Sequence, residues 1–175
     1  MKPLEQLQKS LKIPLLVEEP KSINYLFDIN VSAASALISS NEVKLYLDPR
    51  YFEYYRHLPF VELLPDQIPF PELVGVDSSF TTLDRLASLK KLHPQTVWEG
   101  LSKPIETLRQ IKTEEEKRKL RKAGALNSLG HDFLLSLLKE GVEESELARK
   151  LHLFFIEKGG EAFSFEPIIA FGASS

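Results

Sequence analysis

The chain has 175 residues, of which 43% are apolar and 27% are charged, and its formal net charge at pH 7 is -3. This composition is typical of a globular protein with its own hydrophobic core. The weakly negative charge predicts no broad basic surface, so we expect neither nucleic acid nor a membrane as a partner. Cysteine is absent, which excludes disulfides, thiolate zinc sites and cysteine nucleophiles, so a metal ion would need His, Asp or Glu ligands.

The sequence also lacks signals for export or membrane insertion. No stretch approaches the roughly 18 consecutive apolar residues of a membrane helix, and the first residues have no signal-peptide apolar core. We therefore expect a cytoplasmic protein.

Strand-like runs alternate with helical patterns through the first hundred residues. We expect strands in five apolar stretches: 13–18, 33–38, 43–47, 73–76 and 95–98. A helix should follow the third of these, because Asp48 is a natural N-cap and Pro49 a natural first helical residue. Another helix is expected over 81–92. The alternation predicts an α/β fold with a mixed sheet.

The pattern changes after Pro104 and becomes helical. We expect one long helix over 113–139, with Thr113 as N-cap and Glu116 as its capping-box partner. The apolar residues of its expected buried side are Leu120, Ala123, Leu126, Phe133 and Leu137. A second helix over 145–158 and a buried strand over 163–171 should follow. We place the domain boundary between residues 103 and 104.

Few residues suggest chemistry by their pattern alone. The four histidines have no partner at metal-ligand spacing, and the sequence has neither a glycine-rich phosphate loop nor a Gly-x-Ser-x-Gly elbow. The basic run 117–122 follows three glutamates, which favours a self-paired surface over a nucleic-acid site. The turn Asp48-Pro49-Arg50-Tyr51 places a cation at a strand end, and we favour a structural role for it. No residue is predicted to be catalytic.

Several segments, in their order and spacing, resemble one enzyme family. They are Leu47–Tyr51, Val74–Asp77, Leu108–Thr113 with Glu116 and Arg118, Gly141–Ala148, the pair Gly159-Gly160, and Phe163–Gly172. The chain is similar to the N-terminal portion of prolidases, Xaa-Pro aminopeptidases and creatinase, whose catalytic domain is the pita-bread fold. The resemblance implies a creatinase/prolidase-type first domain over residues 1–103. Residues 104–175 would then be the first two helices and the first strand of a pita-bread domain.

The resemblance also implies a metallopeptidase that cleaves proline-containing peptides. It implies two divalent metal ions (Mn, Co or Zn) held by two Asp, one His and two Glu, all beyond Ser175. The chain alone is therefore expected to be inactive, with Phe165 and Ile168 lining the pocket for the proline ring. We expect a homo-oligomer, such as a homodimer, because the second segment would lack the sheet that covers its apolar residues.

Two alternatives stay open at this point. The pita-bread fold also resembles non-catalytic binding modules for peptides or histones, and creatinase-like amidine hydrolysis is a second enzymatic possibility. Metal-ligand carboxylates in the sequence that follows would separate a metalloenzyme from a binding module.

Overall fold

The structure, a computed structural model, describes residues 2–175. The chain divides into two compact units, a first that ends at Ile111 (unit 1) and a second over Lys112–Ser175 (unit 2). The division therefore falls between residues 111 and 112, and not between 103 and 104 as the sequence suggested. Among the helices of residues 2–175, none is both long and apolar enough to cross a membrane.

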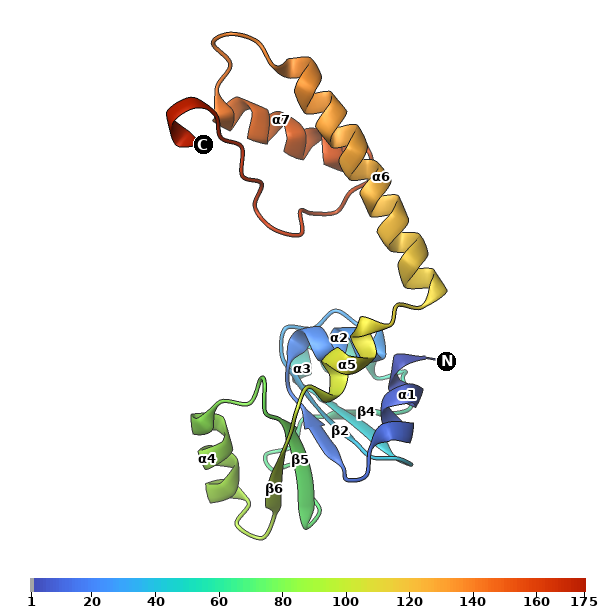
Figure 1. Ribbon diagram of the computed structural model, residues 1–175. Coiled ribbons are helices and arrows are strands. Elements are labelled where there is room, and N and C mark those ends of the chain that lie inside the picture. The colour runs from blue at the N-terminus through green and yellow to red at the C-terminus, as the bar shows by residue number, and fades with distance from the viewer. Residues whose placement is uncertain (1) are drawn as a thin grey trace. The chain divides into compact units, whose positions relative to one another are not determined.

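Unit 1 contains a six-stranded mixed sheet in the order β4-β3-β2-β1-β5-β6 (Figure 1). Strand β2 pairs antiparallel with β1 and β3, and the other neighbours pair parallel. The strands are β1 (Leu15–Val17), β2 (Ala34–Ile38), β3 (Val43–Leu47), β4 (Val61–Leu63), β5 (Leu73–Asp77) and β6 (Val97–Leu101). The predicted α/β class and mixed sheet are confirmed.

Helices cover both faces of this sheet. They are α1 (Pro3–Ser10), α2 (Pro20–Phe27), α3 (Pro49–Tyr55), α4 (Leu83–Leu92) and α5 (Pro104–Gln110). Residues of α1, α2, α3 and α5 pack with Leu15 and Val17 of β1 in the larger core cluster. Leu89 of α4 packs with Leu16 of β1 in a second cluster. Because side chains alternate along a strand, the two clusters lie on opposite faces of the sheet, as the positions of the helices in Figure 1 illustrate.

Helix α5 explains why unit 1 ends later than predicted. Ile105 is buried and belongs to the larger core cluster, and Leu108 packs against the same cluster. The sequence pattern does not reveal α2 or α5, because a helix of seven or eight residues shows barely two turns of periodicity. The predicted cap of α3 is present, with the Arg50 backbone N–H donating to Asp48 Oδ1 over 2.8 Å.

Unit 2 consists of two helices followed by an irregular segment. The helices are α6 (Glu114–Leu137) and α7 (Glu144–Glu157), with a short 3-10 turn, η1 (Gly172–Ser174), near the end. The predicted capping box is confirmed: Glu116 N–H donates to Thr113 Oγ1 over 3.2 Å, and Thr113 N–H donates to Glu116 Oε2 over 2.7 Å. Both helices were predicted to within about two residues at each end.

Two expectations for unit 2 are wrong. Residues 163–171 form no strand, because a strand needs a neighbour for its backbone hydrogen bonds and the described part of unit 2 contains no other strand. Leu120 and Ala123 are exposed, not buried. The contact with α7 lies further along α6, where Gly130 is the helix's one buried residue.

Candidate functional site

Strands β1 and β5 lie side by side and parallel, yet the chain continues from them to opposite faces of the sheet. After β1 it forms α2 on one face of the sheet, and after β5 it forms α4 on the other. In α/β sheets such a reversal opens a crevice beyond the carboxyl ends of the strands, where ligands commonly bind. The fold of unit 1 therefore indicates a candidate binding site at this edge.

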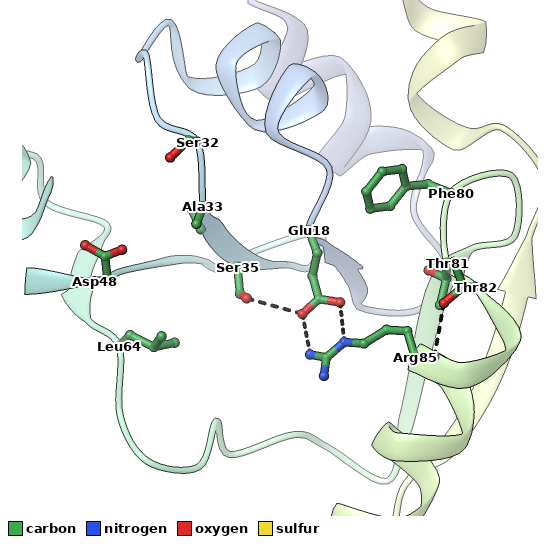
Figure 2. A pocket seen from close by; sticks show the side chains of 11 residues that line it. Glu18, Ser32, Ala33, Ser35, Asp48, Leu64, Phe80, Thr81, Thr82 and Arg85 are labelled. Carbon is green, nitrogen blue, oxygen red and sulfur yellow. Dashed lines mark hydrogen bonds and ion pairs between the residues drawn. The ribbon is translucent and has the colours of Figure 1, made fainter. Parts of the chain in front are cut away.

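A pocket of about 490 Å³ lies at this edge, and we call it the edge pocket. Its walls come from the residue after β1, the approach to β2, the end of β3 and the turn into α4 (Figure 2). The lining residues are Glu18, Ser32, Ala33, Ala34, Ser35, Asp48, Leu64, Phe80, Thr81, Thr82 and Arg85. The volume is within the range of small-molecule sites.

The central feature of the edge pocket is an ion pair between Glu18 and Arg85. Arg85 donates from Nε to Glu18 Oε2 over 2.9 Å and from Nη2 to Oε1 over 2.5 Å. Ser35 Oγ also donates to Oε1, over 3.4 Å. These bonds raise the pKa of Arg85, chiefly through the side-chain hydrogen bond to Glu18. The pair fixes the guanidinium group in one orientation.

The guanidinium keeps one edge for other partners. Within residues 2–175, its second terminal nitrogen, Nη1, makes no recorded hydrogen bond. Figure 2 shows this nitrogen pointing away from Glu18. Arginine has five N–H donors, so Arg85 can hold Glu18 and a second acceptor together.

Asp48 forms the second acidic group of the edge pocket. Arg50 donates to both of its oxygens, with an Nη2–Oδ2 distance of 2.6 Å. This side-chain hydrogen bond is the largest cause of the lowered pKa of Asp48. The remaining lining combines four hydroxyl residues with the apolar residues Ala33, Ala34, Leu64 and Phe80. The pocket therefore combines charged groups of both signs with an aliphatic and aromatic surface.

A second, larger pocket lies within unit 2, between the end of α6, the start of α7 and residues 168–171. Its volume is about 830 Å³, and its lining is mainly apolar. Ile168 borders this pocket with 91% of its surface exposed, whereas Phe165 is 78% exposed and does not line it. Of the two predicted substrate-binding residues, the structure thus places only Ile168 at this pocket.

The residues present do not fit the metal ions that the family resemblance implies. Within residues 2–175, no three His, Asp or Glu side chains gather closely enough to hold a metal ion. His131 has one acidic neighbour, Asp132, at 3.7 Å, and both side chains are exposed.

Comparison with known proteins finds a family match in the second unit. Residues 118–175 match metallopeptidase family M24. The predicted resemblance to a metallopeptidase is confirmed. Among the curated relatives, an uncharacterized peptidase of Staphylococcus epidermidis is 29% identical over 147 residues, which cover 78% of this chain and 42% of that protein. The uncharacterized peptidase YqhT of Bacillus subtilis is 23% identical over 174 residues, covering 92% and 49%.

Solved structures share the fold of both units. The Xaa-Pro dipeptidase from Bacillus anthracis has a TM-score of 0.77 at 21% identity, covering 90% of this chain and 49% of its own. The X-Pro aminopeptidase from Thermotoga maritima has a TM-score of 0.78 at 17% identity, covering 92% and 51%. The chain thus has the fold of the N-terminal half of these two structures. It spans about half the length of the relatives it matches.

The sequence pattern indicates only part of the edge pocket. It predicts Asp48 as a helix cap, but it does not distinguish Glu18 or Arg85 from other charged residues. They are far apart in the sequence, and neither belongs to a motif. Two weak signals were available, namely that Glu18 directly follows a strand and that Arg85 lies in the first turn of a capped helix.

Proposed function

We propose that the chain is the N-terminal half of a metal-dependent peptidase that cleaves bonds to proline, of the Xaa-Pro dipeptidase or aminopeptidase type. The observation that carries this proposal is the M24 match over residues 118–175. The similarity in fold to structures of Xaa-Pro peptidases, which extends through unit 1, supports it.

In this proposal the chain supplies the scaffold of the enzyme and one wall of its substrate site. The two metal ions (Mn, Co or Zn) would polarise the peptide carbonyl and supply a hydroxide for hydrolysis, and their ligands would lie outside this chain. Phe165 and Ile168 would contact the proline ring, because a flat apolar surface suits a pyrrolidine ring. Their exposure within the M24-like segment leaves both side chains accessible to a substrate or to another part of the enzyme.

The proposal includes a cellular location and an assembly. Absence of cysteine from all 175 residues suits a reducing compartment, which supports the cytoplasm. Exposed apolar side chains on unit 2 support a homo-oligomer.

The test is hydrolysis by the protein expressed from the complete open reading frame that encodes this chain. The substrates are alanyl-proline, alanyl-prolyl-alanine and alanyl-alanine, with and without added Mn²⁺. We expect Mn²⁺-dependent cleavage of at least one proline substrate and little cleavage of alanyl-alanine. A folded product that cleaves none of them with Mn²⁺, Co²⁺ or Zn²⁺, or that cleaves alanyl-alanine equally well, would contradict the proposal. Creatine serves as the substrate that detects amidine hydrolysis.

A further inference from the structure

We propose that the edge pocket of unit 1 binds a short zwitterionic peptide with an aliphatic side chain, whose carboxylate is held by Arg85. The inference does not rest on the proposed peptidase activity, because the pocket lies wholly within unit 1 and outside the M24-matched residues.

Arg85 has N–H groups that remain available to a ligand. Its Nε and one Nη2 hydrogen are directed to Glu18, which leaves the edge formed by Nη1 and Nη2 for a second planar acceptor. A carboxylate matches that edge with two parallel hydrogen bonds. Glu18 holds the guanidinium in place before a ligand arrives, so little side-chain entropy is lost on binding.

The charged groups that line the edge pocket favour a ligand with both a positive and a negative group. The lining contains two carboxylates, of Glu18 and Asp48, and one guanidinium, of Arg85. Arg50 neutralises part of the charge of Asp48, but its own side chain does not line the pocket and is 71% exposed. A simple anion would be repelled by the two carboxylates, whereas a ligand that also carries an ammonium group is attracted to them.

The edge pocket also offers apolar surface to a ligand. Ala33, Ala34, Leu64 and Phe80 are the apolar residues that line the pocket. Leu64 and Phe80 are each more than 40% exposed, so they present apolar surface that a ligand could cover. A small aliphatic side chain would bury this surface, at about 25 cal/mol per Å². A volume of about 490 Å³ is ample for a dipeptide.

The experiment is a titration of the 175-residue chain with alanyl-leucine, followed by backbone amide NMR shifts. The same titration is repeated with N-acetyl-alanyl-leucine, which lacks the ammonium group, and with alanyl-leucinamide, which lacks the carboxylate. We expect saturable shifts at residues 32–35 and 80–85 with alanyl-leucine. Loss of the carboxylate should weaken binding by about tenfold or more, since a charge-assisted bidentate contact disappears. Loss of the ammonium group should weaken binding less.

Two matched variants complete the test. Arg85→Lys keeps a positive charge opposite Glu18 but loses the planar edge, so alanyl-leucine should bind about tenfold more weakly. Arg56→Lys is the control, because Arg56 pairs with Glu53 outside the pocket, and it should bind like the original chain. Unchanged amide spectra away from residue 85 would show that the variant is folded. Absent or unsaturable shifts at the pocket, equal binding of alanyl-leucinamide, or equal affinity of the two variants would overturn the proposal.

Discussion

Gly130 of α6 lies directly against the ring of Phe155 in α7. A Cβ added at Gly130 would be 2.5 Å from Phe155 Cζ, too close for any real contact. The ring has neighbours on other sides, with Phe163 at 5.5 Å and Phe154 at 5.8 Å between centroids. The absence of a side chain at Gly130 is therefore what lets the two helices approach.

This contact predicts opposite effects for two glycines of the same helix. Gly124→Ala should stabilise α6 by about 1 kcal/mol, since alanine favours a helix and the position has open space around it. Gly130→Ala should instead destabilise unit 2 by about 1 kcal/mol, because displacing the Phe155 ring outweighs that gain. Urea unfolding monitored by circular dichroism measures both. Equal stabilisation by the two substitutions would refute the tight contact.

The sequence predicted correctly those features that depend on residues close together in the chain. The helix caps at Asp48 and Thr113 follow from residues two or three positions apart, and both are present. The strand expected over 163–171 failed because its apolar residues specify burial but cannot supply a pairing partner. The Glu18–Arg85 pair was missed for a related reason, since the topology of β1 and β5 brings the two residues together.

The capping box of α6 should make its stability depend on pH. Hydrogen bonds from Thr113, first its backbone N–H and then its hydroxyl, lower the pKa of Glu116. Because the folded pKa is depressed, this stabilisation is complete above the unfolded value near 4.5 and is lost as the pH falls through the lower folded value. Glu116→Gln should therefore flatten the acid-induced loss of helix between about pH 5 and pH 3.

At neutral pH, the Thr113 side chain should stabilise α6 as its N-cap. Thr113→Ala should cost about 1 kcal/mol at pH 7, because the Glu116 N–H loses its acceptor. Ser128→Ala, in the exposed middle of α6, is the control and should be neutral or slightly stabilising. Glu146 of α7 also has a lowered pKa, caused chiefly by its side-chain hydrogen bond with Lys150. Because Glu146 contributes to the acid transition of every variant, the acid transition of Glu116→Gln is compared with that of the original chain. An unchanged acid transition in Glu116→Gln would rule out this linkage.

The first unit should fold alone only if α5 is included. Ile105 is 1% exposed within the core, so Ile105→Ala should destabilise unit 1 by about 2–5 kcal/mol. Ile111→Ala removes the same atoms from a residue that is 83% exposed and should change stability by less than about 0.5 kcal/mol. A fragment ending at residue 111 should unfold cooperatively, whereas one ending at 103 should be much weaker. Similar stability of the two fragments would place the boundary back at 103.

Limited proteolysis should cut near residues 111–113, where the chain divides into its two units, and leave unit 1 intact. Early cleavage within residues 34–101 would count against a stable unit 1.

The apolar surface of unit 2 should cause self-association. Leu129, Leu135 and Leu153 are each more than half exposed, as are Phe165 and Ile168. Other large apolar residues of unit 2 are less exposed. Half-buried are Leu126, Phe133, Leu137, Phe154, Phe155 and Phe163, and Leu151 is buried. Burying one exposed side chain of this size is worth roughly 1.5–3 kcal/mol, so association offers a substantial gain.

Light scattering with size exclusion at micromolar concentrations measures this association. We expect the apparent mass to exceed the 19.9 kDa of one chain and to rise with concentration. Replacing Leu129, Leu135 and Leu153 together by glutamine should lower it, while the same number of exposed lysines changed to glutamine should not. A concentration-independent monomer, with residues 113–171 protected from hydrogen exchange, would show that unit 2 needs no partner.

The proposed role of this chain, as the scaffold of a peptidase whose metal ligands lie outside it, can be checked by measuring bound metal. The measurement is the metal content of the purified 175-residue chain after incubation with Mn²⁺ or Zn²⁺ and dialysis. Because no three ligand side chains gather within residues 2–175, we expect far less than one metal ion per chain. Two metal ions retained per chain would contradict it.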